Sequence, residues 1–446
     1  MNKFLSVWLM VFLIGWNSFS AHSQEQDDER KRRLDVLRYG IETQVIELIT
    51  TFGTEKNKDY EAELLHVFDS ATSPKLRSII LDYYGSLRLD TAVSRAAGII
   101  RVRDETSDSL VGSAFSYLLS LKSDAAVEQA RRIIEDDERK YLTAAIKILG
   151  ATGKNDDVEI LRVLYESASL DAGTKQEILL AFGKMRAADS FELLASIASA
   201  EDAGKIERMY ACTALGDLGD ARAVPVLIGA SVVTDPNIRA SALGALQNFD
   251  ENAADNAILQ GLRDQHVIPR LAAIKAVEKR QLKAAIPFLE FRIKSDPERS
   301  IKDASIEVLA SIGGEGGMDF LSTFIEDTKS PLAHRASAFV AILTHGSSED
   351  FERPMVVLKA AAADKDKAVF TALARSAMAS SAPQATSVAR FLLSNDDHLI
   401  RLGAVAWAER NKAVELLPEL KSIAESDPVE SLRKRVVTTI ERIGRP

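Results

Sequence analysis

The sequence repeats itself about every 32 residues over nearly its whole length. A basic residue marks the repeat: nine of twelve positions, spaced 31 to 34 residues apart, hold Lys or Arg, whereas 56 such residues in 446 would place one or two there by chance. These marker positions are Arg77, Leu110, Leu142, Lys175, Arg208, Arg239, Arg270, Lys302, Arg335, Val369, Arg401 and Arg433. A period of this length is typical of repeat proteins, in which each unit buries its apolar face against its neighbours.

A second column of residues supports the same register. Seven residues after each marker, or two helical turns, ten of the twelve positions hold a large apolar residue. The column reads Tyr84, Tyr117, Leu149, Phe182, Leu215, Leu246, Val277, Leu309, Ile342, Ser376, Ala408 and Ile440. A shift of one or two residues at Ser376 would bring Met378 into line, so we expect the tenth unit to be irregular. The boundaries of that unit and of units one to three stay open.

Each unit is interpreted as two short helices, A and then B, of which B carries the marker. Prolines favour this division, because Pro fits the first turn of a helix and not its interior. Prolines fall where B helices should begin and early in A helices; the two sets are Pro74, Pro236, Pro297, Pro331 and Pro428, and Pro225, Pro287 and Pro418. We therefore expect twelve helix pairs that stack into an all-α, right-handed solenoid over residues 59–446.

Both ends of the repeat array have the features of caps. Residues 24–58 contain four successive basic residues at 30–33 and an amphipathic run from Leu34 to Phe52, which predicts one helix that covers the first pair. The last predicted helix is rich in charge, with Arg433, Lys434 and Arg435 in a row. We expect this basic cluster to be a solvated end rather than a binding patch.

Residues 1–23 have the three parts of a secretory signal peptide: Lys3, an apolar run from Phe4 to Trp16, and a polar stretch with small residues at Ala21 and Ser23. The alternative is a retained membrane anchor, which needs roughly 20 apolar residues, more than this run supplies. We expect cleavage before Gln24 and a soluble protein in the periplasm or outside the cell. The sole cysteine, Cys212, lies on an apolar helix and is expected to be a buried thiol.

Residues 205–249, 264–290, 296–321 and 396–420 resemble HEAT repeats, in particular the short repeats first noted in phycobilisome-lyase-like proteins. Asp235, Ile238, Arg239, Ala242 and Leu246 recur in phase, and the likeness covers about residues 59–443. The resemblance implies that turn aspartates and B-helix arginines form a ladder between repeats, which gives a structural role to Asp235, Arg239, Arg270, Asp296 and Arg401. It also implies that B helices line the concave side of a superhelix, where such proteins hold a partner.

No set of residues in the sequence predicts catalysis. The acidic runs 136–138 and 396–398 offer metal ligands, but both precede a B helix, where acidic residues cap the helix and complement its dipole. The six histidines are scattered over separate repeats, and none is followed by Glu as in the iron-binding HEAT hydroxylases. Neither a nucleophile elbow nor a phosphate-binding loop occurs. We expect no catalytic residues, no metal and no cofactor, and no motif supports bilin lyase activity.

The net charge of −9, which becomes −10 if Lys3 leaves with the signal, argues against general nucleic-acid binding. We therefore expect a non-catalytic scaffold that binds a protein or an extended peptide on its concave face, without stable membrane insertion. Tyr83 and Tyr210 lie beside the apolar columns and are the predicted exposed contacts. Two alternatives stay open: a repeat-lyase-like or metal-dependent enzyme, and a structural spacer that binds nothing. The partner and the oligomeric state are not determined by the sequence.

Overall fold

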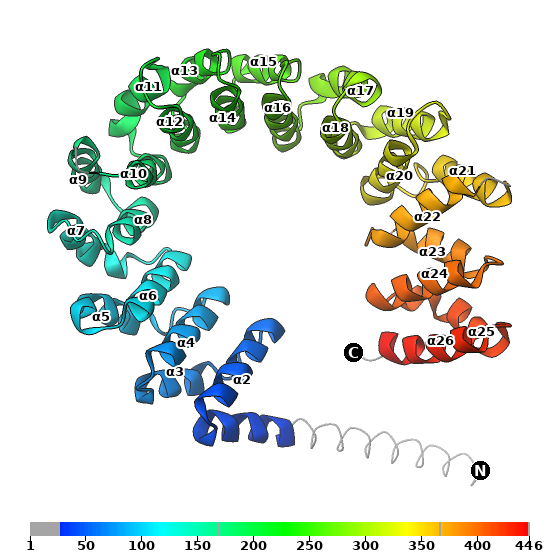
Figure 1. The fold of residues 1–446 in the computed structure, drawn as a ribbon, viewed down its shortest axis with the longest axis horizontal. Coiled ribbons are helices and arrows are strands. Elements are labelled where there is room, and N and C mark those ends of the chain that lie inside the picture. The colour runs from blue at the N-terminus through cyan, green and yellow to red at the C-terminus, as the bar shows by residue number, and fades with distance from the viewer. Residues whose placement is uncertain (1–26, 168–169, 365–366, 383, 445–446) are drawn as a thin grey trace, which may run out of the picture. The chain divides into compact units, whose positions relative to one another are not determined.

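The computed structural model describes residues 27–167, 170–364, 367–382 and 384–444, and no strand occurs within these ranges. The chain divides into two compact units, residues 1–196 and 197–446. In each unit the helices alternate between two layers (Figure 1). The predicted all-α solenoid is confirmed, and the described helices form the twelve A-plus-B pairs expected from the repeat. The predicted signal peptide, residues 1–23, lies outside the described residues.

In the first unit, the B helices pack side by side in one layer and the A helices form the other (Figure 1). The A helices are α3 (Glu61–Ser70), α5 (Val93–Arg101), α7 (Val127–Glu135) and α9 (Asn155–Glu166). The B helices are α4 (Pro74–Ser86), α6 (Asp108–Ser120), α8 (Leu142–Thr152) and α10 (Ala172–Met185). Three 3-10 turns stand in the links: η1 (Arg103–Glu105), η2 (Asp124–Ala126) and η3 (Ala188–Ser190). Helix α11 (Phe191–Ser199) crosses the boundary between the units.

The second unit continues the same alternation, with its B helices on the concave side of the curve that this unit makes (Figure 1). The A helices are α13 (Ala223–Ala230), α15 (Asn252–Gly261), α17 (Ile286–Ser295), α19 (Gly314–Glu326), α21 (Glu352–Ala363), α23 (Ala385–Leu393) and α25 (Leu417–Ser426). The B helices are α12 (Lys205–Leu218), α14 (Pro236–Leu246), α16 (Val267–Arg280), α18 (Arg299–Ile312), α20 (Leu332–His345), α22 (Ala368–Ala379), α24 (His398–Arg410) and α26 (Glu430–Ile443). Two 3-10 turns, η4 (Lys283–Ala285) and η5 (Val414–Leu416), precede α17 and α25.

The segment before the first helix pair differs from the prediction in its number of helices. It forms two helices, one over residues 27–39 and α2 (Glu42–Glu55), instead of a single helix from Leu34 to Phe52. The break falls at Gly40 and Ile41, where the backbone of Ile41 is extended. Helix α2 packs beside α4, the B helix of the first pair.

The B helices begin where prolines and short polar side chains favour a first turn. Pro74 and Pro236 are the first residues of α4 and α14. The residues before them, Ser73 and Asp235, accept backbone N–H groups of the first turn through their side chains. These contacts satisfy N–H groups that have no partner within the helix.

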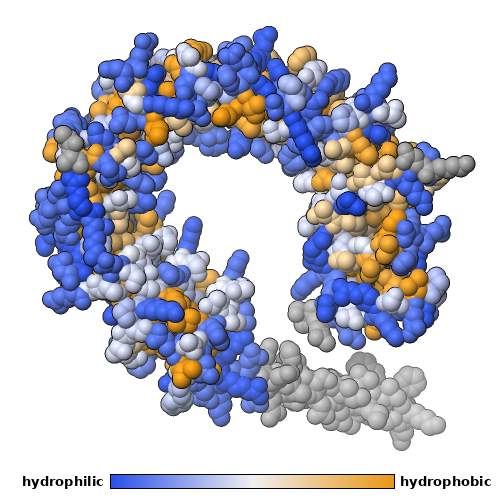
Figure 2. Space-filling model, viewed as in Figure 1, coloured by the Kyte–Doolittle hydropathy of each residue, from blue (hydrophilic) through white to orange (hydrophobic). Residues whose placement is uncertain are grey.

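The core lies between the two layers and contains the predicted apolar column. Leu215, Leu246, Val277, Leu309 and Ile342 are each fully buried. Because stacked pairs bury these side chains against both neighbours, the core continues from one repeat to the next within a unit. Figure 2 shows hydrophobic residues mainly in the seam between the layers, with hydrophilic residues around them.

The tenth unit has the predicted irregularity, and the structure gives its size. In α22 the buried positions are Phe370, Leu373, Ala374 and Ala377, so the register is one residue later than the Val369 and Ser376 columns. Ala377, rather than Met378, occupies the column position. Among the described helices, none is both long and apolar enough to cross a lipid bilayer.

Candidate functional site

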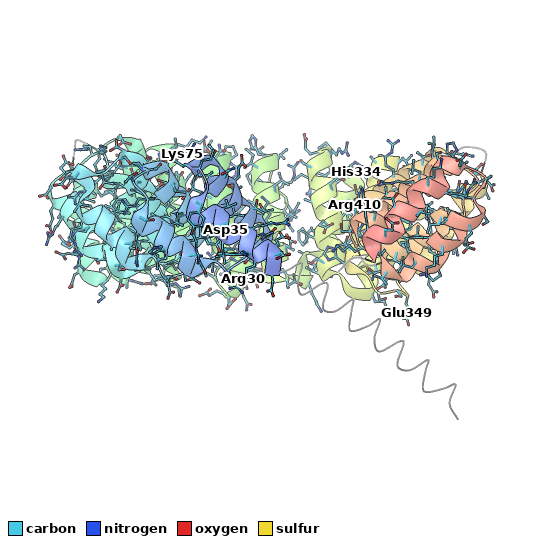
Figure 3. The ribbon with its side chains drawn as sticks, turned by 90° about the horizontal axis from the view of Figure 1, so that it is seen from below. Arg30, Asp35, Lys75, His334, Glu349 and Arg410 are labelled. Carbon is cyan, nitrogen blue, oxygen red and sulfur yellow. The ribbon has the colours of Figure 1, made fainter. Side chains whose placement is uncertain are left out.

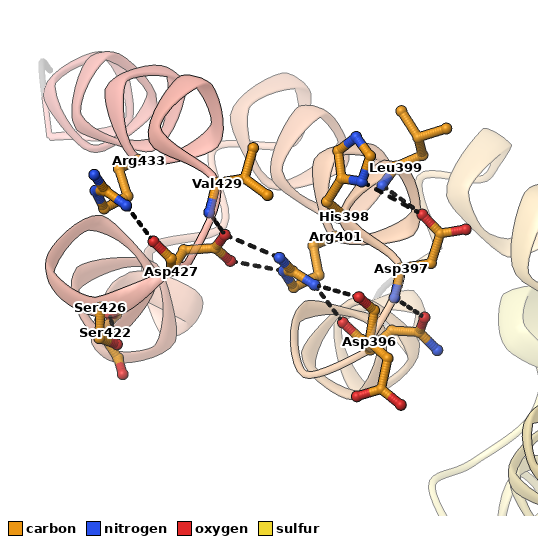
Figure 4. Close-up of polar contacts among 11 residues, drawn as sticks. Asp396, Asp397, His398, Leu399, Arg401, Ser422, Ser426, Asp427, Val429 and Arg433 are labelled. Atoms are coloured by element: carbon orange, nitrogen blue, oxygen red, sulfur yellow. Dashed lines mark hydrogen bonds and ion pairs between the residues drawn. The ribbon is translucent and has the colours of Figure 1, made fainter.

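A ladder of ion pairs joins successive repeats of the second unit near the starts of the B helices (Figure 4). Arg401 donates from Nε and Nη2 to the carboxylate oxygens of Asp427 at 2.7 and 2.9 Å. Its Nη1 donates to the carbonyl oxygens of Asn395 and Asp396. Asp427 also accepts the backbone N–H of Val429 at 2.9 Å. Arg401 therefore binds the backbone of the link before α24 and the aspartate of the next repeat, and that aspartate accepts a backbone N–H at the start of α26.

Similar rungs occur in the middle of the unit. Arg239 donates to Asp264 from Nε and Nη2 at 2.7 and 2.8 Å, and Arg270 donates from Nη2 to Asp296 at 3.1 Å. In all three rungs the aspartate follows the arginine by 25 or 26 residues. The paired side chains are at most 12% exposed. Since a buried charge is costly unless it is paired, each rung favours the stacking of one repeat on the next.

Asp235 does not lie in a rung of this kind, although it was predicted for the ladder. Its carboxylate accepts the backbone N–H groups of Asn237 and Ile238 and pairs with Lys205 Nζ at 3.0 Å. Asp235 stands four residues before its marker arginine, at the N-cap, whereas the rung aspartates stand six residues before the next marker. The two positions have different roles, which the repeat alone did not separate.

Two rung residues, Asp264 and Asp427, were missed by the sequence reasoning. The signal that identifies them is their six-residue distance to Arg270 and Arg433, which Asp296 shares relative to Lys302. An aspartate in this position lies at the start of an A–B link or within it, and it pairs with the arginine of the preceding B helix.

The pKa values of the rung residues Asp264 and Asp427, and of Asp235, are lowered. Burial works to raise the pKa of Asp264, but hydrogen bonds from Arg239 and from the backbone N–H of His266 outweigh it, so the pKa is lowered. The pKa of Asp427 is lowered in the same way, against its burial, by Arg401 and the N–H of Val429. For Asp235, the hydrogen bonds from Lys205 and from the start of α14 overcome burial and lower the pKa to about 2.

The ladder is interrupted between α18 and α22. Lys302, the marker of α18, donates to the carbonyl oxygen of Lys294 at 3.3 Å, and no described carboxylate lies within ion-pair distance of it. Arg335 of α20 donates to the carbonyl oxygen of Ile325 at 2.7 Å. In α22 the marker position is held by Phe370, which is 2% exposed. The bonding between repeats therefore changes in this part of the second unit.

An open groove of about 740 Å³ lies on the B-helix face at this interruption. Helices α18, α20 and α22 line it, and small side chains make up much of its lining: Ala333, Ala336, Ser337, Ala372, Ser376 and Ala379. Small side chains let a bound chain approach the helix backbones closely. We call this surface the B-face groove.

The charged residues of the B-face groove differ in their partners. Asp303 lies 3.0 Å from both His334 Nδ1 and Ser337 Oγ, and these contacts outweigh its burial to lower its pKa. Glu307 lies 2.6 Å from His345 Nε2. Arg375, in contrast, has no hydrogen-bond or ion-pair partner among the described residues. The carboxylates of the groove are thus paired within the protein, whereas Arg375 of α22 is available to a ligand. Figure 3 labels His334, which contacts Asp303.

In two other hollows the charged lining residues are all paired. A groove of about 410 Å³ lies between α6 and α8, and its cations are paired, Lys140 with Asp108 and Lys147 with Glu177. A hollow of about 880 Å³ lies between α13 and α15. Its charged lining consists of the Arg239–Asp264 rung, which already serves the ladder.

The two tyrosines predicted as exposed contacts, Tyr83 and Tyr210, differ in their exposure to solvent. Tyr83 is only 4% exposed, and its hydroxyl donates to the carbonyl oxygen of Asn57, so the prediction of an exposed Tyr83 is wrong. Its ring packs edge-on against Tyr84 in the core of the first pairs. Tyr210 lies on the B helix α12 and is half-buried.

The acidic runs considered as metal ligands do not form a metal site in the described residues, which contain no group of three or more His, Cys, Asp or Glu arranged to hold an ion. Asp397 caps α24 by accepting the N–H of Leu399 at 2.9 Å (Figure 4). Asp137 pairs with Arg139 at 2.8 Å in its own link. Cys212 is fully buried, and burial raises the pKa of its thiol to about 12.

Comparison with solved structures finds helical repeat proteins. The complex of CpcE and CpcF of phycocyanin lyase from Nostoc sp. PCC7120 is 20% identical, with 52% of this chain and 91% of that chain covered and a TM-score of 0.31. Kap121p is 12% identical, with 93% and 56% covered and a TM-score of 0.42, so this chain spans little more than half of its length. Kap121p bound to Nup53p gives 11% identity, coverage of 94% and 57%, and a TM-score of 0.43.

No curated protein matches the chain in sequence. One family does match: the family described as spirochaete HEAT repeat protein matches residues 37–439, which cover all twelve helix pairs except the last four residues of α26. The chain therefore belongs to the spirochaete HEAT repeat protein family.

Proposed function

We propose that this protein is an exported, non-catalytic scaffold that binds another protein on the B-helix face of its second unit. The observation that carries the proposal is the B-face groove: an open surface lined by small side chains, with Arg375 unpaired beside it. The HEAT-repeat fold is compatible with protein binding. A long row of B helices also offers many weak contacts at once, so that affinity can come from extended contact instead of one deep pocket.

The test is to fill the groove and follow the partner. Ser376→Trp places a large side chain in the groove lining, and Lys359→Trp, on the exposed A helix α21, is the matched control. Tagged protein is crosslinked in cells and captured from the envelope fraction. We expect the partner to be lost from Ser376→Trp and retained by Lys359→Trp, with both variants as helical as the wild type by circular dichroism. Equal recovery from all three proteins would refute a role for this face.

The proposed location has its own test. Cleavage before Gln24 predicts a mature protein that begins with that residue and appears in the periplasmic or culture fraction. Mass spectrometry of the purified mature protein measures the cleavage point directly. A chain that retains residues 1–23 in the cytoplasm would contradict export.

The two alternatives predict different results in the same material. An enzyme of the lyase or metal-dependent kind should purify with a chromophore or a stoichiometric metal, which absorbance and elemental analysis detect. A structural spacer should show no partner whose capture depends on the B-helix face. The scaffold proposal requires a colourless, metal-free protein with a face-dependent partner.

A further inference from the structure

We propose that the B-helix face of α20, α22, α24 and α26 binds an acidic protein segment that also carries aliphatic side chains. This inference rests on the binding face proposed above and adds the chemistry of its occupant. The evidence comes from the balance of charge on these helices, from the partners of each charged group, and from the exposed aliphatic residues between them.

Acidic side chains are few on α20, α22 and α24, whereas α18, which also lines the groove, carries Asp303 and Glu307, both of which contact histidines. Across α20, α22 and α24, the sole acidic residue is Glu409. It lies 2.6 Å from Arg435 and also pairs with Arg442, both on α26. These ion pairs lower the pKa of Glu409, Arg442 contributing most. The one carboxylate of α20, α22 and α24 is therefore paired with two arginines, and α26 adds Glu430, which pairs with Lys434, and the exposed Glu441.

Two cations of the same region lack a carboxylate partner. Arg375 on α22 has no partner among the described residues, and Arg410 at the end of α24 donates to the carbonyl oxygen of Met378. Both side chains are exposed, and Arg410 is labelled in Figure 3. A positive surface on a chain whose net charge is −9 is a local feature that favours an acidic partner, because complementary charge sets specificity and speeds association.

Aliphatic side chains are exposed on the same row of B helices as these cations. Leu399 and Leu402 lie one turn apart on α24 and are 63% and 38% exposed, and Val437 on the adjacent helix α26 is 48% exposed. Helix α22, which lines the B-face groove, packs against α24. The groove and the aliphatic residues thus lie on neighbouring B helices. Exposed apolar residues next to a charged rim are typical of a protein-binding surface.

The same helices lack the features that nucleic acid requires. Their aromatic residues, Phe339, Phe370 and Trp407, are at most 2% exposed, so none is available to stack on a base. The exposed apolar residues of these helices are instead small or aliphatic. A peptide with carboxylates for Arg375 and Arg410 and aliphatic side chains for Leu399 and Leu402 matches this surface better.

The test selects ligands without knowledge of the natural partner. A library of random short peptides displayed on phage is panned against the mature chain, and an enriched peptide is synthesised with a fluorescent label. We expect enriched peptides to be acidic and to contain Leu, Ile, Val or Met. In anisotropy titrations, Arg375→Glu and Arg410→Glu should each weaken binding by about tenfold or more, and Arg375→Lys should retain most of it. Lys359→Glu, an equal charge change at an exposed lysine on α21 that has no ion-pair partner among the described residues, should leave the affinity unchanged.

The inference would be overturned if panning enriched basic or uncharged peptides, or enriched no peptide. It would also be overturned if Lys359→Glu lost as much affinity as the arginine variants. A single-stranded oligonucleotide that bound more tightly than the selected peptide at the same salt concentration would overturn it as well. Its failure is separable from that of the proposed function. If Ser376→Trp abolishes capture of a partner whose contacting segment is basic, the binding face stands and the acidic occupant does not. If Ser376→Trp retains its partner, both the proposed binding face and the acidic occupant are refuted.

Discussion

Removal of one buried ladder charge should destabilise the second unit far more than removal of an exposed charge with the same geometry. Asp264→Asn keeps the shape of the side chain but leaves Arg239, which is 8% exposed at its side chain, without its carboxylate. Loss of one partner of a buried ion pair typically costs about 3–5 kcal/mol. Arg239 retains the carbonyl oxygens of Val233 and Thr234 as acceptors, so we expect the lower end of this range, about 3 kcal/mol.

The matched control is Asp69→Asn in the first unit. Asp69 accepts two hydrogen bonds from Arg95, both at 2.6 Å, in the same two-bond form as the Arg239 rung, although here the arginine follows the aspartate by 26 residues and both lie on A helices. The side chains are 47% and 33% exposed, and exposed pairs contribute only about 0–1 kcal/mol. The two substitutions therefore separate burial from geometry.

The assay is native-state hydrogen exchange, because a repeat array opens locally and each repeat contacts only its neighbours. A loss of about 3 kcal/mol corresponds to a roughly hundredfold decrease in protection of the amides of α14 and α16. Asp69→Asn should change protection in α3–α6 by less than about tenfold. If Asp264→Asn has no larger effect than Asp69→Asn, the ladder does not hold the repeats together and the reasoning is wrong.

Three further predictions concern acid, packing and the thiol. The pKa values of Asp235 (about 2), Asp264 and Asp427 are lower in the folded protein than in the unfolded chain. Their contribution to stability is therefore complete above about pH 4 and is lost as the pH falls through the folded pKa values. Urea unfolding at several pH values should show this loss of stability, and the loss should be smaller in Asp235→Asn. A Cβ at Gly216 would lie 2.8 Å from the Cβ of Ala245 on the adjacent B helix, so Gly216→Ala should destabilise the protein by about 1–3 kcal/mol. A Cβ at Gly244 would have no atom within 4 Å, so Gly244→Ala should stabilise the protein by about 1 kcal/mol. Urea denaturation measures both changes. Burial raises the pKa of Cys212 to about 12, so iodoacetamide should modify it only after unfolding; rapid modification of the folded protein, followed by mass spectrometry, would contradict this burial.

The architecture was predictable because two independent columns fix it. A marker such as Arg239 and an apolar residue seven positions later, such as Leu246, place both ends of a B helix, and prolines mark its start. Stacking then follows from burial alone, since a short helix pair cannot bury its apolar face without neighbours. Helix breaks that depend on a single residue were harder to find, as at Gly40, where the predicted cap divides into two helices.

The site was less predictable, because it depends on contacts between residues far apart in the sequence. The marker arginines were found, but Asp264 and Asp427 were not, since an aspartate in a link can equally cap the next helix, as Asp235 does. Tyr83 was misplaced because its hydroxyl reaches the carbonyl oxygen of Asn57, a contact that helix periodicity does not encode. The B-face groove depends on small side chains of α20 and α22, which form no sequence motif.

The most direct test of the binding face is site-specific photo-crosslinking in cells. A photoreactive amino acid is placed at Ser376, in the groove of the second unit, or at Lys359, on the A helix α21. The proposal predicts a discrete crosslinked partner from Ser376, absent from Lys359, with the crosslinked peptide of the partner identified by mass spectrometry. A partner that crosslinks from Lys359 and not from Ser376 would contradict the B-helix face as the binding surface.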